Sequence, residues 1–232
     1  MDLKELDLVD PKTHWYYQSK LVAIKKALRK YAPNPTRIID IGAGSGFFSI
    51  SVANFSAGTN VVCVDPNYPA DSVERGGSLT YTLSGEPQRG DVYLLIDVLE
   101  HVADDVALLR SSTSAADPGA IVIISVPAFM SLWSAHDVFL EHFRRYRLPE
   151  IIRLSEEVGL EVQSSQYLFG SIFIPAALVR RINRDKGVGS DLHTLPKTVN
   201  SILRSVVSTE HRLFSNRLFG LSAFVVARVP PH

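Results

Sequence analysis

The residues from Asp40 to Gly46 have the types and the spacing to hold a small cofactor. Asp40 lies near the end of an apolar run, Arg37–Ile41, and Gly42, Gly44 and Gly46 follow it. Such a run is typical of a strand buried on both faces, and glycines let a ligand approach the backbone closely. In an open α/β sheet this is where an adenosine-type cofactor docks, although a tight turn without ligand is the simpler alternative. The spacing G-x-G-x-G also differs from the dinucleotide fingerprint G-x-G-x-x-G.

A second acidic residue, Asp65, ends the next β-branched run, Asn60–Val64. It lies 65 − 46 = 19 residues after Gly46. An acid at this place can accept hydrogen bonds from both hydroxyl groups of a ribose. A helix cap or a solvated strand end is the alternative. Together with the glycine turn, Asp65 indicates a ribose-bearing cofactor.

Two further polar stretches come after later apolar runs. Asp97, Glu100 and His101 follow Asp91–Ile96, and an aromatic and basic stretch, 129–146, follows the next run. Because the carboxyl ends of parallel strands meet at one edge of a sheet, we expect both stretches beside the glycine turn. Carboxylate and imidazole groups could bind a divalent ion there. We favour the alternative, that Glu100 and His101 cap and pack the following helix, and predict no metal.

Strand patterns alternate with helical patterns along most of the chain, which indicates a parallel sheet with helices on both faces. Helical patterns lie at His14–Tyr31, Gly46–Asn54, Asp104–Ser114 and Leu148–Val158. Strand patterns lie at Arg37–Ile41, Asn60–Val64, Ser78–Leu83, Asp91–Ile96, Ala120–Val126, Leu160–Leu168 and Leu218–Arg228. Residues 169–217, between strands six and seven, look mostly helical. The sequence therefore predicts a doubly wound α/β fold with a helical insertion before the last strand.

One domain is expected, and it has four parts. Residues 1–35 are predicted as an N-terminal helical lid, 36–170 as the cofactor-binding core, 171–217 as the insertion and 218–232 as the final strand. The aromatic stretch His14–Tyr17 would fold the lid over the cofactor. The alternative is that these aromatic residues only anchor an amphipathic helix to the domain.

Composition excludes several other classes of protein. The 24 basic and 24 acidic residues balance, so the global charge predicts no nucleic-acid partner. A single cysteine, Cys63, excludes a disulfide framework and a thiolate metal cluster, which fits a reducing cytoplasm. The first eleven residues have no signal-peptide core, and no window of about 18 uncharged apolar residues occurs. We therefore expect a cytoplasmic protein.

The predicted insertion combines an apolar stretch, Ile172–Ile182, with basic residues. Residues 171–217 hold eight basic and three acidic residues, a difference of +5 on a neutral protein. An apolar face with basic flanks can lie on an anionic membrane surface, so peripheral membrane contact through 171–186 is one interpretation. A substrate lid and a homodimer interface are others. The commonest meaning of such a stripe is a packed core face.

The motifs, taken in order, resemble those of class I S-adenosylmethionine-dependent methyltransferases. The match consists of Asp40–Gly46, Asp65, Asp97–His101 and the strand 121–126, and it covers residues 36–170 plus the last strand. Within that family the chain is similar to a bacterial branch of the type 11/12 group, which includes ubiquinone-pathway O-methyltransferases. The resemblance implies a Rossmann-like, mostly parallel seven-stranded sheet with an antiparallel last strand. It also implies S-adenosylmethionine as the cofactor.

The same resemblance implies roles for the cofactor-side residues. Asp40 and the glycines would surround the methionine part, Asp65 would hold the ribose, and Asp97 would sit beside the sulfonium. The full implied set is Asp40, Gly42, Ala43, Gly44, Gly46, Asp65, Pro66, Asp97 and Val98. Related ubiquinone-type enzymes carry Glu-x-x-Glu-His, which has been interpreted as a metal site. This chain has Asp97-x-x-Glu100-His101, so Glu100 and His101 are its weak metal candidates.

The stretch 129–146 is expected to form the acceptor side of the site. The acceptor-side candidates are Tyr17, Trp133, His136, Arg145 and Tyr146, and the catalytic candidates are His136, His142 and Asp97. A hydroxyl acceptor must lose a proton, and histidine, with an unperturbed pKa of roughly 6.5, is the natural base. His136 is favoured over His142, because Asp137 and Trp133 would place it in a polar, lid-like loop. The alternative is that His136 and Asp137 fix the loop while Arg144, Arg145 and Tyr146 tie it to the sheet.

The sequence thus predicts a methyltransferase that acts on a small-molecule, sugar or lipid-linked acceptor at oxygen. N-methylation of a small metabolite is an alternative. A nucleotide-linked oxidoreductase is a second one, which the glycine spacing opposes. A non-catalytic, methyltransferase-like binding domain is the third.

Overall fold

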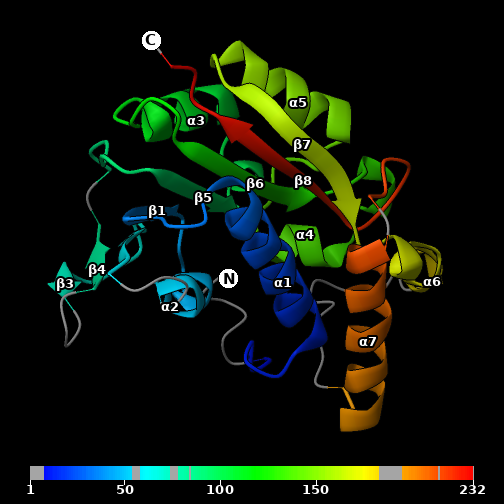
Figure 1. Cartoon of the computed structure of the whole chain (residues 1–232). Coiled ribbons are helices and arrows are strands. Elements are labelled where there is room, and N and C mark those ends of the chain that lie inside the picture. The colour runs from blue at the N-terminus through cyan, green and yellow to red at the C-terminus, as the bar shows by residue number, and fades with distance from the viewer. Residues whose placement is uncertain are drawn as a thin grey trace.

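The computed structural model describes residues 8–53, 58–73, 78–83, 85–182, 195–213 and 215–231. Figure 1 shows one twisted sheet with helices on both faces. The strands are β1 (Arg37–Ile41), β2 (Asn60–Val64), β3 (Ser72–Val73), β4 (Leu79–Thr82), β5 (Val92–Ile96), β6 (Ile121–Pro127), β7 (Glu161–Leu168) and β8 (Ser222–Arg228). Their order in the sheet is β3-β4-β2-β1-β5-β6-β8-β7.

The sheet is parallel except at two places. The long strands β4, β2, β1, β5 and β6 pair in parallel, whereas β8 runs antiparallel to both β6 and β7. The expected doubly wound, mostly parallel sheet with an antiparallel last strand is therefore confirmed. The described residues add one element, the two-residue strand β3, which pairs antiparallel with the edge strand β4.

The last strand begins later than predicted. We expected it from Leu218, but β8 starts at Ser222. The side chain of Asn216 accepts a hydrogen bond from the Leu218 nitrogen and donates one to the Phe219 oxygen, which holds this segment in a turn. Gly220 then passes so close to β7 that an added Cβ would lie 2.3 Å from the Leu168 oxygen.

Two apolar cores lie on opposite faces of the sheet. Successive residues of a strand point to opposite faces, so Ile38 joins one core and Ile39 joins the other. The first core is covered by α1 (Trp15–Tyr31), α2 (Phe47–Ala53) and α7 (Lys197–Leu213), and the second by α3 (Asp105–Thr113) and α5 (Leu148–Glu157). This two-sided covering explains why the central strands are almost uniformly apolar.

Helix ends follow the predicted signals where these were clear. The side chain of Asp104 caps α3 by accepting a hydrogen bond from the Ala107 nitrogen at 2.8 Å. Pro149 lies in the first turn of α5, and Gly159 follows its end with φ of 90°. Both helices therefore lie within one or two residues of their predicted bounds.

The expected helical insertion contains two helices, α6 (Gly170–Ile182) and α7, which lie side by side. Residues 183–194 of the insertion lie outside the described residues. Helix α7 packs mainly against α1, and the Asn200 side chain joins the two by accepting a hydrogen bond from the Trp15 nitrogen at 2.8 Å. No helix in the described part of the chain is long and apolar enough to span a membrane.

Candidate functional site

The motif residues meet at the carboxyl edge of the sheet, where β1 and β5 lie next to each other. From β1 the chain moves through β2 to β4 on one side, and it returns through β5 to β6 on the other. The loops after β1 and β5 therefore lead to opposite sides of the sheet, and such a switch in strand order is where ligands bind in doubly wound sheets. We call the place between these two loops the crevice. The loop after β1 is the glycine turn, and the loop after β5 begins with Asp97.

The glycine turn has a backbone that only glycine adopts easily. Gly42, Gly44 and Gly46 have φ values of 64°, 52° and 69°. A Cβ on Gly42 would lie 2.7 Å from the Val98 side chain, so the loops after β1 and β5 touch at this point. The structure thus brings together Gly42 and Val98, which the sequence placed in one cofactor site.

Asp65 is buried and holds the glycine turn in shape. One carboxylate oxygen accepts a hydrogen bond from the Gly44 nitrogen at 2.8 Å, and the other accepts one from the Asn67 nitrogen at 2.9 Å. A carboxylate has about four lone-pair positions, so capacity remains for ligand hydroxyls. Pro66, which follows, is exposed. The ribose-binding role of Asp65 stays a prediction, and its position on the turn agrees with it.

Asp40 lies beneath the turn and is almost fully buried. Its carboxylate accepts a hydrogen bond from the Ser49 hydroxyl, which belongs to α2. Burial raises the pKa of Asp40 to about 6, although the Ser49 hydrogen bond opposes this shift. A carboxylate inside an otherwise apolar strand is costly without a function or a partner.

Sequence reasoning missed a buried cluster formed by Lys20, Tyr16 and Asp97. The Lys20 ammonium donates to the Tyr16 hydroxyl at 2.7 Å and to one Asp97 carboxylate oxygen at 2.5 Å. Asp97 has a positive φ of 55°, which is strained for a residue with a side chain. Its other oxygen is buried without a hydrogen-bond partner among the described residues. The cluster places a charged pair where the crevice meets α1.

A sequence signal for Lys20 did exist. Lys20 lies on the same helix face as Tyr17 and Ile24, at spacings of three and four residues, and that face is buried. A lysine on an apolar face needs a carboxylate partner, but the sequence does not show that Asp97 supplies it. The Coulombic attraction of Asp97 outweighs burial and raises the pKa of Lys20, so the ammonium stays charged.

The structure places the Tyr17 ring in the core, and its acceptor-side role stays a prediction. We placed Tyr17 on the acceptor side, but its ring is buried against Phe47 and Phe48 of α2. Its neighbour Tyr16 faces the sheet edge instead, where it stacks on Phe169 and lies 3.5 Å from the Ser222 hydroxyl. The rotation of α1 about its axis determines which of the two tyrosines faces the sheet edge. The run of aromatic residues alone did not reveal that rotation.

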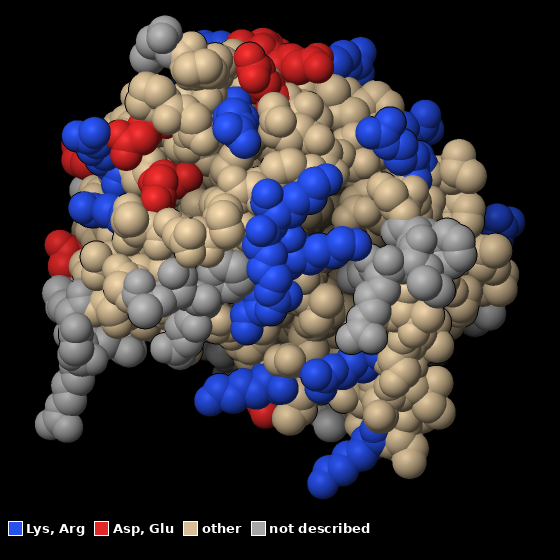
Figure 2. Space-filling model, viewed as in Figure 1, with Lys and Arg blue, Asp and Glu red and all other residues tan. Residues whose placement is uncertain are grey.

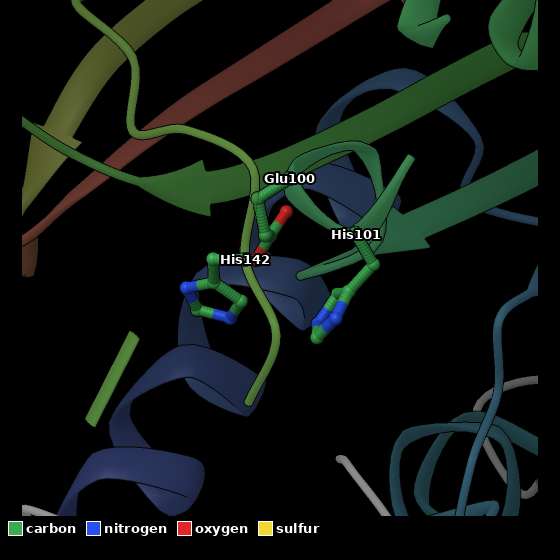
Figure 3. Close-up of side chains that lie close together, drawn as sticks. All are labelled: Glu100, His101 and His142. Carbon is green, nitrogen blue, oxygen red and sulfur yellow. The ribbon is translucent and has the colours of Figure 1, made fainter. Parts of the chain in front are cut away.

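Glu100, His101 and His142 converge, as Figure 3 shows. One possible ligand atom of each lies within 4.8 Å of those of the other two. Glu100 is fully buried, and neither carboxylate oxygen has a hydrogen-bond partner among the residues that the structure describes. Burial and then the nearby Asp97 raise the pKa of Glu100 well above its usual value.

These three side chains could hold a divalent ion. Two imidazoles and one carboxylate are a ligand set used by zinc and iron sites. The His142 Nδ1 atom lies 2.9 Å from an Asp137 oxygen, which orients the ring as carboxylates do for metal-bound histidines. Glu100 and His101 were weak metal candidates, and His142 joins them from 41 residues away (142 − 101). The expectation of no metal stays a prediction.

The stretch after β6 is held together by a buried ion pair. Arg145 binds Asp137 through two nearly parallel hydrogen bonds of 2.6 and 2.8 Å, and its guanidinium also reaches the Ala128 oxygen. Burial alone would raise the pKa of Asp137, but the hydrogen bonds from His142 and Arg145 hold it well below its usual range. Asp137 also completes a capping box with Ser134 at the start of α4 (Ala135–Phe139).

Arg145 and Tyr146 therefore anchor this loop, which agrees with the alternative from the sequence, and their acceptor-side role stays a prediction. The buried Tyr146 hydroxyl donates to Asp105 at 2.8 Å and lies 3.1 Å from the Leu99 oxygen, so it ties the loop to the segment after β5. Trp133 and His136 are half-buried beside them. Their acceptor-side and catalytic roles stay predictions.

A family model described as a methyltransferase domain matches residues 14–165. The chain is 25% identical over 181 residues to a ubiquinone biosynthesis O-methyltransferase of Pseudoalteromonas translucida, covering 67% of this chain and 75% of that protein. It is 32% identical over 153 residues to the protein of the same name from Aeromonas salmonicida, covering 55% and 63%.

Solved structures share the fold at low identity. A 1,6-didemethyltoxoflavin-N1-methyltransferase of Burkholderia thailandensis, solved with S-adenosylhomocysteine, aligns with a TM-score of 0.58 at 16% identity, over 93% of this chain and 80% of that one. A SAM-dependent methyltransferase of Archaeoglobus fulgidus aligns with a TM-score of 0.53 at 16% identity, over 90% and 94%.

Proposed function

Because the chain belongs to the family of methyltransferase domains, which are class I and use S-adenosylmethionine, we propose that it methylates an oxygen atom of a small-molecule, sugar or lipid-linked acceptor. The observation that carries this proposal is the meeting of the glycine turn with Asp65 and Asp97 around the crevice between β1 and β5.

The residues around the crevice fit the cofactor. Three glycines at alternate positions, each with positive φ, leave the backbone open to a ligand, and a side chain on Gly42 would collide with Val98. The unpartnered oxygen of Asp97 offers negative charge where a positive sulfonium would lie. Asp40 and the turn would hold the methionine part, and Asp65 would hold the ribose hydroxyls. S-adenosylmethionine supplies an electrophilic methyl group on a positively charged sulfur.

The protein's main task in this reaction is alignment. Direct displacement at a methyl group needs the attacking atom and the leaving sulfur in line, and positioning alone can supply about 7–11 kcal/mol of the barrier. The Lys20–Asp97 pair fixes the start of the loop after β5, and Arg145 fixes the loop after β6. The two walls of the crevice are thus rigid before the acceptor enters.

A hydroxyl acceptor must also lose its proton, and His142 is the base that we favour. Asp137 binds the Nδ1 side of its ring at 2.9 Å, which leaves Nε2 to accept the proton. A carboxylate that holds a histidine in one orientation is a recurring arrangement in general-base catalysis. His136, the other candidate, lies in α4 and is half-buried.

The names of the relatives support oxygen as the atom methylated. The matched curated proteins are ubiquinone biosynthesis O-methyltransferases, whereas one structural neighbour is an N1-methyltransferase. N-methylation of a small metabolite therefore remains the second candidate. The family match removes the nucleotide-linked oxidoreductase, and a non-catalytic binding domain would have no need for the intact crevice.

Titration calorimetry with S-adenosylhomocysteine tests the cofactor part of the proposal. We expect binding by the wild-type protein and a loss of binding in Asp65→Ala, because buried ribose hydroxyls would lose their acceptor. Asp65→Asn, which keeps the shape and can still accept from Gly44, separates loss of charge from collapse of the turn. Absence of binding by the wild-type protein at millimolar ligand would contradict the proposal.

A product screen with isotope-labelled S-adenosylmethionine then tests the acceptor class. Quinols, sugars and hydroxylated lipids should accept the label, and matched amines should not. His142→Ala should lower turnover of a hydroxyl acceptor while leaving S-adenosylhomocysteine affinity unchanged, because the base contacts only the acceptor. Labelling of amines alone would favour the N-methyltransferase.

A further inference from the structure

Helices α6 and α7 expose a row of large apolar side chains. In α6, Ile174 and Leu178 lie four residues apart on one face and Val179 lies on the next face. In α7 the spacings of three, four and seven form one stripe along the helix. We call them the α6/α7 apolar surface: Ile174, Leu178, Val179, Val199, Ile202 and Val206. Their exposures run from 41% to 63%, whereas a helix in a monomer normally turns its apolar stripe inward.

The charges around this surface have one sign. Among the side chains of α6 and α7 that the structure describes, the exposed charged ones are Arg181, Lys197 and Arg204. The acidic residue Glu210 is half-buried and accepts hydrogen bonds from the backbone nitrogens of Gly170 and Ser171. Figure 2 shows α7 largely tan, with Lys and Arg side chains beside it and over α1, while acidic side chains gather at the opposite end.

The surface is joined to the acceptor side of the crevice. The Phe173 ring of α6 contacts Phe129, which follows β6, at a centroid distance of 5.5 Å. The Arg180 guanidinium donates to the Leu132 oxygen of the same loop. Helix α7 holds the start of α1 through Asn200. A ligand lying along α6 would therefore reach the acceptor side without crossing the cofactor side.

We propose that the α6/α7 apolar surface docks on an anionic lipid bilayer. The apolar side chains enter the headgroup region, and Arg181, which shares a face of α6 with Ile174 and Leu178, binds the lipid phosphates. Lys197 and Arg204 lie on the other side of α7 from its stripe and add to the attraction from a greater distance. Docking goes beyond the proposed reaction, and its consequence for that reaction is that the acceptor is lipid-linked. Residues 183–186, part of the range in which we expected membrane contact, lie outside the described residues, and the surface does not include them.

The charges favour a bilayer over a second copy of the chain. A two-fold dimer through this surface would bring the same patch from both copies together. The basic residues of one copy would then face those of the other, and like charges in contact are unfavourable. An anionic bilayer presents the opposite charge to the same residues.

Vesicle flotation with the full-length protein tests the proposal. We expect flotation with vesicles in which about one third of the phosphatidylcholine is replaced by phosphatidylglycerol, little with phosphatidylcholine alone, and weaker binding as salt rises. Leu178→Asp should lower the bound fraction at least about tenfold, because it places a charge in the apolar stripe. Arg181→Glu should lower it about tenfold by reversing an attractive charge.

Matched controls show whether binding is lost because the α6/α7 apolar surface is changed or because any exposed residue is changed in the same way. Ile50→Asp changes an exposed isoleucine of α2, and Arg110→Glu reverses an exposed arginine of α3, so both should float as the wild type does. The proposal is overturned if the wild type does not bind anionic vesicles, or if Leu178→Asp and Ile50→Asp lose binding equally. It is also overturned if light scattering shows a wild-type dimer that Leu178→Asp dissociates and no vesicle binding.

S-adenosylhomocysteine calorimetry on the same samples keeps the two proposals distinguishable. Protein that floats but does not bind S-adenosylhomocysteine would refute the methyltransferase and leave docking supported. Protein that binds S-adenosylhomocysteine but does not float would refute docking alone. Leu178→Asp and Arg181→Glu should keep wild-type affinity for S-adenosylhomocysteine, because neither residue belongs to the crevice.

Discussion

At the scale of single residues, the pair formed by Lys20 and Asp97 connects the N-terminal helix to the loop after β5. Both charges are largely shielded from water, so each depends on the other for compensation. The pair also helps to hold Asp97 at its strained φ of 55°. One contact thus fixes α1 and one wall of the crevice.

Removing one partner of this pair should be costly. Lys20→Met leaves a partly buried carboxylate without its cation, which should lower the free energy of unfolding by about 3–5 kcal/mol. Urea denaturation measures this change. Lys30→Met, an exposed change in the same helix, should stay within about 0.5 kcal/mol of the wild type.

A double-mutant cycle checks the cause. Adding Asp97→Asn to Lys20→Met should recover part of the loss, because the uncompensated charge is then removed as well. Additive losses in the double variant would show that Lys20 acts through packing and not through Asp97.

The cluster of Glu100, His101 and His142 makes a second prediction at this scale. Two imidazoles and a carboxylate can bind zinc, and zinc would take the His142 Nε2 atom that a base needs. A calorimetric titration with Zn²⁺ should therefore show one inhibitory site, and Glu100→Ala should remove it. Binding should weaken at lower pH, since protons compete for Glu100, whose pKa is raised.

His142→Ala should weaken zinc binding as Glu100→Ala does, whereas His136→Ala should not. Equal binding by all three variants would place the ion elsewhere on the protein. Absence of binding by the wild type would support the expectation from sequence that no metal is held.

Sequence reasoning at residue scale succeeded where a local pattern constrained the backbone. The glycine turn, Asp40 and Asp65 lie where the strand-turn-helix pattern put them, because each is fixed by its own few neighbours. Lys20 and His142 were not assigned their partners, since those partners are distant in sequence and only packing brings them together.

At the scale of elements, Glu210 of α7 stabilises the start of α6. Its carboxylate accepts hydrogen bonds from the Gly170 and Ser171 nitrogens at 2.7 and 2.9 Å and from the Ser171 hydroxyl. A negative charge at a helix N-terminus also interacts favourably with the helix dipole. The two helices of the insertion thus depend on each other.

Glu210→Ala should therefore loosen α6. Losing these charge-assisted hydrogen bonds should cost about 1–3 kcal/mol of local stability. Hydrogen exchange of the α6 amides should accelerate, and exchange in α5 should not change. Glu156→Ala, an exposed change on α5, is the control and should leave exchange in α6 at the wild-type rate.

Elements with strong periodicity were predicted to within a residue or two, and weak ones were not. Strands β1, β2 and β5 are mostly apolar, so their positions were clear. The two-residue β3 is too short to show a periodic pattern of apolar residues. It is recognised as a strand only by its antiparallel pairing with β4. The turn before β8 depends on Asn216, whose two backbone contacts no periodicity reveals.

At the scale of the whole molecule, buried carboxylates make stability depend on pH. The folded-state pKa of Asp40 is about 6, above the ordinary value of 3.8. A group whose pKa is raised by folding contributes stability that is present below its unfolded value and is lost as pH rises through its folded value. Asp40 therefore favours the folded state most at acidic pH.

Asp40→Asn should remove this dependence. Relative to the variant, the wild type should lose about 2 kcal/mol of unfolding free energy between pH 4 and pH 7, because its pKa is raised on folding. Chemical denaturation at several pH values measures the difference. A constant difference between the two proteins across this range would show that burial does not shift Asp40.

The fold class could be predicted as a whole because alternation of strands and helices leaves few arrangements. The positions of the residues on the predicted cofactor side followed from it, since the carboxyl edge of the sheet is determined by the topology. The acceptor half did not, because the loop after β6 is shaped by the ion pair between Asp137 and Arg145 and by α6, which are tertiary contacts.

The place of β8 has a consequence for how the protein is made. This last strand lies between β6 and β7, so neither of them has its partner while the preceding residues are being synthesised. Because β8 must leave the ribosome before it can pair, the sheet closes only after translation has passed Arg228. Until then, two unpaired strand edges are exposed, and such edges bind chaperones or aggregate.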